Sequence, residues 1–275
     1  AAKERFRAMP AADRALLIRN VTLIDGTGGE PLPHASVLAI GERIALVSPG
    51  DIKPPRGATV IDGKGKYLMP GLINSHIHLP GGREGSGANR KLSMDVELGT
   101  AVLQAMLYAG VTAGYDSGNH DEFIFRMRED EHAGRIVGAR LYTTGRMLTP
   151  ARGYQCCSGA LQVTDYDSTL PALDAMLARQ PDMIKITREG RGMSVRSEDL
   201  ALIPLEVMTR LVEHVHEAGL RVSVHISDEK SARESIAAGV DALAHPVYLE
   251  EASPAFAKLV AAKGLPVSTT LGRLD

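Results

Sequence analysis

The chain has 275 residues and a formal net charge of −2, and 44% of its residues are hydrophobic and 23% charged. These values are ordinary for a globular protein with a sizeable core, and the charge argues against a nucleic-acid binder. The sequence contains no apolar run near the roughly 20 residues that a membrane-spanning helix needs. Cys156 and Cys157 are adjacent, which is poor geometry for an ordinary disulfide bond. We therefore expect a small-molecule substrate rather than a nucleic acid or a membrane.

The first part of the chain has a strand-and-turn pattern. Strands are predicted over residues 15–24, 35–40, 43–47 and 58–62. Gly41-Glu42 lies between two apolar runs and predicts a tight hairpin. Residues 1–66 are therefore expected to form a small β-domain in which no chemistry is visible.

Beyond this β-domain, apolar strands alternate with helical stretches. The strands are predicted at residues 72–79, 111–115, 139–144, 183–187, 220–226, 240–245 and 266–271. The helices are predicted at 95–109, 121–133, 168–179, 200–218, 230–238 and 253–262. This alternation predicts a parallel sheet, and no Gly-rich phosphate loop follows its first strand. Residues 67–275 are therefore expected to form an α/β domain, a (β/α)₈ TIM-type barrel that lacks its last strand.

Polar side chains occur at the predicted carboxyl ends of four of these strands. His76 and His78 are two residues apart on the first strand, so both side chains point to the same face. Lys185 lies in the fourth strand, His225 ends the fifth and His245 ends the sixth. Each alone could be a hydrogen-bonded core histidine or a lysine that reaches the surface. Because the active site of such a barrel lies at these strand ends, their joint placement predicts a functional site.

Several motifs in this part of the chain resemble those of the amidohydrolase superfamily. Within it, the chain is similar to the imidazolonepropionase-like and prolidase-like metal-dependent hydrolases. The motifs are Met69-Pro70-Gly71-Leu72-Ile73-Asn74-Ser75-His76-Ile77-His78, Asp182-Met183-Ile184-Lys185-Ile186, Val224-His225-Ile226 and the segment that ends in Ala244-His245. The similarity extends over residues 15–271, and the first 66 residues resemble the small β-sandwich portion that accompanies such barrels.

The resemblance implies a binuclear metal centre with two divalent ions, which we expect to be Zn²⁺. His76 and His78 would bind the more buried ion, and His225 and His245 the other. Lys185 would be carboxylated by CO₂ and would bridge the two ions as a carbamate. Two such ions lower the pKa of a shared water molecule to give hydroxide and polarise a substrate carbonyl. The implied function is hydrolysis of an amide or peptide C–N bond.

The chain departs from this family at its end. Relatives supply an Asp from the eighth strand, which ligates a metal and transfers a proton, whereas this sequence stops just after the seventh predicted strand. We therefore expect either a fragment of a longer enzyme or a partner chain that completes the barrel, and we expect a homo-oligomer. Two alternatives stay open: a cyclic-amide hydrolase or deaminase on the same scaffold, and a non-catalytic metal-binding fragment or pseudoenzyme.

Candidate substrate residues lie in the loops that follow the strands. Tyr154 occupies a loop position where relatives often carry a His, and it could donate a hydrogen bond to a substrate carbonyl. His120 follows the second strand and is a second candidate for a substrate contact. Cationic residues gather in these loops, namely Arg83, Arg90, Lys91, Arg152, Arg188, Arg191 and Arg196. Guanidinium groups bind carboxylates through paired hydrogen bonds, which hints at a carboxylate-bearing substrate, whereas the ordinary explanation of these residues is a solvated rim of charge.

Overall fold

The structure, a computed structural model, describes residues 14–80, 95–156, 159–190 and 200–270, together with the backbone of 83–84 and 91–92. The chain divides into two compact units, Ala1–Gly71 and Leu72–Asp275. Within the described residues, no helix has the length and apolar character needed to cross a membrane.

The smaller unit contains one five-stranded sheet built around β1 (Ala15–Leu23). On one side, β1 pairs antiparallel with β2 (Leu32–Ile40), which continues through the predicted hairpin into β3 (Arg43–Ser48). On its other side, β1 pairs in parallel with β4 (Thr59–Asp62) and β5 (Tyr67–Leu68). Residues of β1 and β2 form two small apolar clusters. Buried and less buried residues alternate at both ends of β1, as expected for a strand period of two, whereas β2 buries four residues in a row, 35–38.

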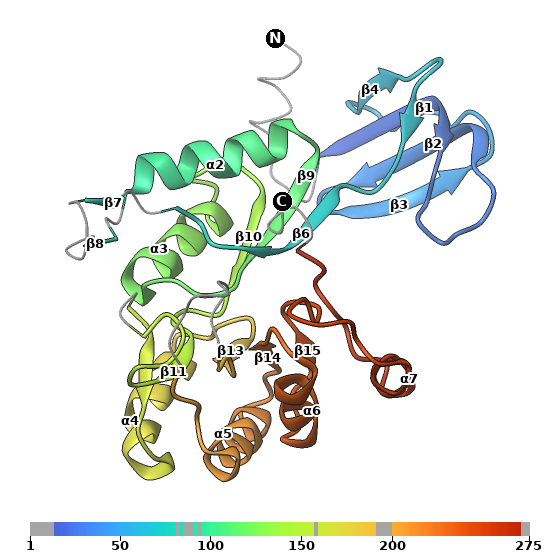
Figure 1. The fold of residues 1–275 in the computed structure, drawn as a ribbon. Helices are drawn as coiled ribbons and strands as arrows, with labels where there is room; N and C mark the ends of the chain where they lie inside the picture. The colour runs from blue at the N-terminus through green and yellow to red at the C-terminus, as the bar shows by residue number, and fades with distance from the viewer. Residues whose placement is uncertain are drawn as a thin grey trace. The chain divides into compact units, whose positions relative to one another are not determined.

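The larger unit is a mixed α/β structure whose two main sheets are parallel (Figure 1). One sheet has the strand order β10-β9-β6 and the other β12-β11-β13-β14-β15. The bounds are β6 (Leu72–Ile77), β9 (Val111–Asp116), β10 (Arg140–Thr143), β11 (Leu148–Pro150), β12 (Leu161–Val163), β13 (Ile184–Thr187), β14 (Val222–His225) and β15 (Ala242–Leu243). A separate antiparallel pair consists of β7 (Arg83–Glu84) and β8 (Lys91–Leu92). Sequence patterning did not predict the short strands β7, β8, β11 and β12.

Six helices alternate with these strands close to the predicted positions. They are α2 (Val96–Tyr108), α3 (Asp121–His132), α4 (Tyr166–Leu177), α5 (Leu205–Glu217), α6 (Glu229–Ala237) and α7 (Pro254–Ala262). Asp95, Asp165 and Asp228 accept a backbone N–H at the first turn of α2, α4 and α6, which satisfies one of the groups that a helix start leaves unbonded. Helices α2 and α3 lie side by side against β9 and β10 (Figure 1).

The strands and helices enclose two apolar clusters, which gives the larger unit the architecture of a partial (β/α)₈ barrel. One cluster joins β6 and β10 to α2 and α3. The other joins β11 to β15 with α4 to α7. Between β10 and β13, the Asp182 amide donates to Thr143 O at 2.8 Å, and the Asp182 carboxylate accepts the Thr143 amide at 2.8 Å. The two sheets do not form one closed ring in the described residues.

The predicted seventh strand over residues 266–271 is shorter than expected. Only an isolated parallel bridge, between Leu243 and Val267, forms there, and residue 271 lies outside the described residues. Pro246 and Pro266 have no amide hydrogen, so neither can donate to a strand ladder. This explains why β15 and its neighbour pair over so few residues.

Phe125 on α3 offers a test of the core between the helices and the sheet. Its side chain is 0% exposed, whereas Tyr108 on α2 is 95% exposed. We expect Phe125→Ala to lower the free energy of unfolding by about 3–5 kcal/mol, because it removes a buried ring and leaves a cavity. The control Tyr108→Ala should change it by less than about 0.5 kcal/mol. Urea denaturation measures both, and equal losses would contradict this packing.

Candidate metal centre

The four predicted histidine ligands lie together at the carboxyl ends of the strands. His76 is in β6 with His78 just beyond it, His225 ends β14, and His245 follows β15. The ring centroids of His76 and His78 are 5.2 Å apart, those of His76 and His245 4.6 Å, and those of His225 and His245 4.5 Å. Parallel strands bring these residues together from distant parts of the sequence, as the barrel predicts.

Backbone carbonyls orient the first two imidazoles. His76 Nδ1 lies 3.0 Å from Ala244 O, and His78 Nδ1 lies 2.9 Å from Gly118 O. Since a carbonyl only accepts hydrogen bonds, each Nδ1 carries a proton, and in the neutral imidazole Nε2 then keeps a lone pair. The two Nε2 atoms are 3.3 Å apart, and two nitrogen ligands of one tetrahedral zinc ion are about 3.3–3.4 Å apart. The pair therefore has the donor chemistry and spacing that one ion requires.

The four histidines and the carboxylates near them do not converge on a single ion. Among the described residues, no three His, Cys, Asp or Glu side chains are placed to hold a metal ion together. His225 Nε2 lies 3.4 Å from a carboxylate oxygen of Glu189, and His245 Nδ1 lies 2.9 Å from the Thr270 hydroxyl. The spacing of His76 and His78 thus suits one metal ion, and His225 and His245 lie beside that pair.

Lys185 is buried among these groups. It lies in β13, opposite Ser223 of β14, and only 2% of its surface is exposed. Burial lowers the pKa of its ammonium from 10.5 to about 7, and the negative charge of Asp116 partly opposes this shift. Within the described residues, no carboxylate forms an ion pair with Lys185. The site therefore favours the neutral amine over a buried cation.

The imidazoles of His76, His225 and His245 are also held in their neutral forms. Burial, together with the charges of Lys185 and His78, lowers the pKa of His76 to about 2. Burial lowers the pKa of His225 to about 4, and Glu189 partly opposes this shift. Burial lowers the pKa of His245 as well, and the charges of His225 and Lys185 lower it further. Neutral imidazole is the form that binds a metal ion, so these histidines are ready to bind at neutral pH.

Two buried carboxylates at the site were missed in the sequence. Asp116 ends β9 and is 0% exposed, and Glu189 lies two residues beyond β13 and is 1% exposed. Burial raises the pKa of Asp116, while His78 and hydrogen bonds from neighbouring amides lower it. Both residues were detectable, because they occupy the same strand-end positions that identified the histidines.

The predicted substrate residues have different surroundings. Tyr154 lies at the site, with its ring stacked on His225 at a centroid distance of 4.0 Å and an interplanar angle of 14°. His120 precedes α3, and its ring lies so close to Gly159 that a Cβ there would overlap it. Arg152 is exposed, in a left-handed conformation with φ of 63°. Among the described residues, neither His120 nor Arg152 touches the predicted ligands.

The expectation that Arg188 offers its guanidinium to a substrate is wrong. The side chain is 7% exposed and donates two hydrogen bonds to Glu234 of α6, at 2.9 and 2.6 Å. It also donates to Ile203 O at 2.9 Å. A buried guanidinium needs such partners, so Arg188 joins β13 to α6 instead. The side chains of Arg83, Arg90, Lys91, Arg191 and Arg196 lie outside the described residues.

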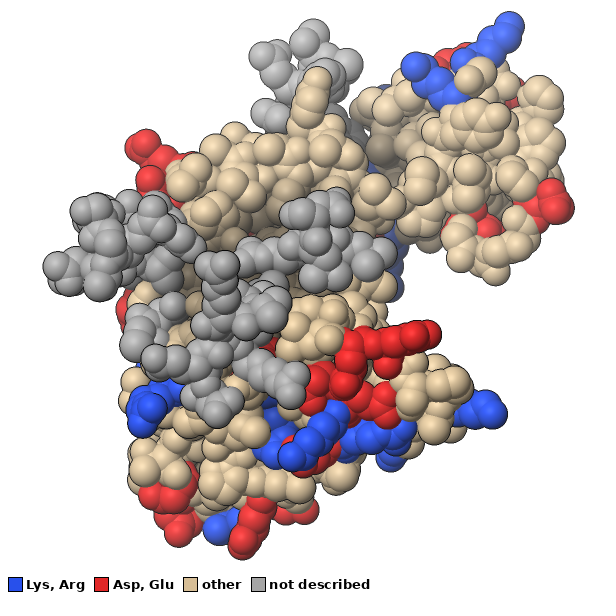
Figure 2. Space-filling model, in the orientation of Figure 1, with Lys and Arg blue, Asp and Glu red and all other residues tan. Residues whose placement is uncertain are grey.

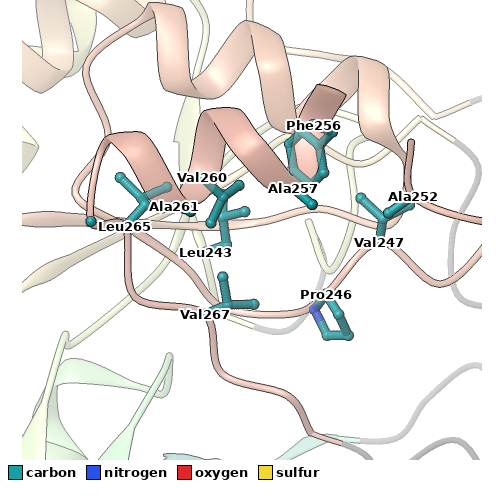
Figure 3. Close-up of a pocket in the computed structure, with 11 residues that line it drawn as sticks. Leu243, Pro246, Val247, Ala252, Phe256, Ala257, Val260, Ala261, Leu265 and Val267 are labelled. Atoms are coloured by element: carbon teal, nitrogen blue, oxygen red, sulfur yellow. The ribbon is translucent and has the colours of Figure 1, made fainter. Parts of the chain in front are cut away.

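An apolar pocket lies apart from the histidines, between β15 and α7 (Figure 3). Its lining includes Leu243, Phe256 and Val260 and contains none of the predicted ligands. On the face of the larger unit drawn in Figure 2, acidic and basic side chains are interspersed below a largely uncharged region.

Comparison with known proteins places this site in a family. The model of the amidohydrolase family matches residues 67–275. An adenine deaminase of Rubrobacter xylanophilus is 46% identical over 141 residues, which cover 50% of this chain and 20% of the deaminase. An enamidase of Eubacterium barkeri is 24% identical over 212 residues, which cover 76% of this chain and 49% of the enamidase.

The fold is also similar to that of solved structures. A prolidase crystallised with N-methylphosphonate-L-proline superposes with a TM-score of 0.78 at 21% identity, covering 92% of this chain and 65% of the prolidase. The chain thus spans about half or less of the two curated relatives named above and about two thirds of that structure. The family match over residues 67–275, together with the parallel strands and the histidines at their ends, shows that the chain belongs to the amidohydrolase family.

Proposed function

We propose that the protein is a metal-dependent hydrolase that cleaves the C–N bond of a small carboxylate-bearing substrate, such as a dipeptide or an N-acyl amino acid. The observation that carries this proposal is the cluster of imidazoles around the buried amine of Lys185, which forms no ion pair with a carboxylate among the described residues. Membership of the amidohydrolase family supports hydrolysis, and the prolidase with its proline analogue supports a substrate of this class.

In this proposal the chain would hold two divalent ions, and the nitrogen ligands favour Zn²⁺. His76 and His78 would hold one ion, and His225 and His245 the other. The neutral Lys185 amine would attack the carbon of CO₂: an N–C bond forms, one C=O π bond opens to leave a negatively charged oxygen, and the nitrogen releases a proton to solvent. The resulting carbamate is an anion with two oxygens, so it could bridge two cations as a carboxylate does. Such ions polarise a carbonyl and make water more acidic.

Other residues of the chain would orient the substrate. Tyr154, whose ring is stacked on His225, would donate a hydrogen bond from its hydroxyl to the oxygen of the scissile carbonyl. We propose His120 and Arg152 as further substrate contacts in the loops above the strands, with Arg152 facing a carboxylate. These groups would fix the substrate carbonyl near the histidines.

Substitution of Lys185 tests the metal-bridging role. We expect the intact protein to contain about two equivalents of divalent metal, and Lys185→Ala to lose at least one equivalent and nearly all hydrolase activity, because the bridging anion is gone. The control Lys258→Ala, an exposed lysine of α7, should keep both. Elemental analysis measures the metal, and ¹³C NMR after incubation with labelled bicarbonate detects a carbamate only where Lys185 is present.

The outcomes separate this proposal from its alternatives. An intact protein that binds no metal would rule out the metal-dependent mechanism. A Lys185→Ala variant with full metal content and activity would rule out the bridging carbamate and favour a mononuclear deaminase.

Deamination is the second candidate, favoured by the 46% identity with an adenine deaminase over 141 residues. A panel that contains adenine, cyclic amides, Xaa-Pro dipeptides and N-acyl amino acids distinguishes the two. We expect turnover of the carboxylate-bearing substrates, with a kcat/KM at least tenfold above that for adenine. Ammonia release from adenine without peptide cleavage would overturn the favoured assignment.

The neutral state of the imidazoles predicts a pH dependence of stability. His225 has a folded-state pKa of about 4 and an ordinary pKa of 6.5, so between these values the unfolded chain binds more protons. The metal-free protein should therefore be most stable above pH 6.5 and lose stability as the pH falls toward 4. The loss from His225 is on the order of 3 kcal/mol.

Denaturation of the metal-free protein at a series of pH values measures this effect. His225→Gln should flatten the curve between pH 6.5 and 4. His34→Gln, an exposed histidine of β2, should keep the wild-type pH dependence. A wild-type curve that is flat over this interval would contradict a neutral, buried His225.

A further inference from the structure

We propose that Asp116 is a positioning residue, which holds His78 so that its Nε2 atom faces the metal ion. This inference rests on the proposed metal centre and adds a residue that ligand motifs do not identify. Asp116 is fully buried at the end of β9, next to β6 in the sheet, and Ile77 is its partner in register.

The carboxylate of Asp116 accepts hydrogen bonds from the residue after His78 and from the residue whose carbonyl binds the His78 ring. Oδ2 accepts the amide of Leu79, the residue that follows His78, at 2.6 Å. Oδ1 accepts the amide of Gly118 at 3.1 Å, and the carbonyl of Gly118 is the group that binds His78 Nδ1 at 2.9 Å. One side chain therefore fixes both the segment that carries the imidazole and the acceptor that selects its tautomer.

Asn119 completes this arrangement. Its Nδ2 group donates to Asp116 Oδ2 at 3.0 Å and to Leu79 O at 2.9 Å. The segment that carries Asp116 and Asn119 is therefore hydrogen-bonded to both the amide and the carbonyl of Leu79. Gly118 has a φ of 139°, and a Cβ there would lie 2.9 Å from Met147 Cε, so the position requires glycine. The direction of the Gly118 carbonyl is thus set by the backbone and held by Asp116.

Only a carboxylate can fill this role. Three N–H donors point at Asp116, and both of its oxygens accept. An asparagine of the same shape would direct its own NH₂ group against one of these donors and leave a buried amide unsatisfied. Because its oxygens are already occupied by these donors, Asp116 acts through His78 rather than as a ligand itself.

The test compares Asp116→Asn with a matched control in the intact protein. We expect Asp116→Asn to weaken Zn²⁺ binding by about 10- to 100-fold, the range for partners that orient metal ligands, as measured by competition with a chelator. Asp182→Asn is the control, because Asp182 also accepts a backbone amide, that of Thr143 at 2.8 Å, and binds Arg128 at 3.1 Å. Asp182 precedes β13, at its amino end, so this variant should lower thermal stability without changing Zn²⁺ affinity.

A second measurement reads the tautomer directly. In ¹⁵N NMR of the metal-free protein, His78 should carry its proton on Nδ1 in the wild type and lose this preference in Asp116→Asn. If Asp116→Asn fails to fold, Asn119→Ala removes one of the donors and should weaken Zn²⁺ binding to a smaller extent.

Three outcomes would overturn the inference: Zn²⁺ affinity within twofold of wild type in the folded Asp116→Asn or Asn119→Ala variant, an unchanged His78 tautomer in Asp116→Asn, or an equal loss of affinity in Asp182→Asn. If the wild type itself binds no Zn²⁺, the proposed function fails first, and the comparison of variants tells the two failures apart.

Discussion

The parallel register of β13 and β14 is the constraint on which the site depends. Lys185 lies opposite Ser223, and Thr187 opposite His225, so the amine and the imidazole come from adjacent strands at the same edge. Parallel pairing directs all the carboxyl ends to one side of the sheet. A slip of one residue would turn each side chain to the opposite face, which would remove Lys185 from the histidines.

The carboxyl ends of β13 and β14 contribute less to the free energy of folding than apolar residues would at the same positions. Lys185 and the histidines are removed from water, and their pKa values fall because burial disfavours the charged forms. By contrast, the buried guanidinium of Arg188, just beyond the same strand, donates hydrogen bonds to Glu234. Arg188 therefore joins two elements of the fold, whereas Lys185 has no carboxylate in an ion pair among the described residues, as the proposed chemistry requires.

Family membership does not by itself select the substrate. This chain is similar to an adenine deaminase over half of its length, and its fold is similar to that of a prolidase. Activity depends on the residues of a site rather than on the fold that carries them. In this chain the loop that carries Tyr154 brings an aromatic ring onto His225, which is where a choice between substrates would be made.

The sequence by itself determined the order of strands and helices, the family resemblance and the strand-end positions of the four histidines and Lys185. These are local properties, since hydrophobic period, turn residues and motif spacing are all visible within short segments. Only the tertiary structure decided that Asp116 binds the amide of Leu79, that Arg188 is paired with Glu234, and that the seventh strand is reduced to one bridge. Each depends on which distant segments meet, and the partner of a buried polar group is set by that packing rather than by the residues beside it.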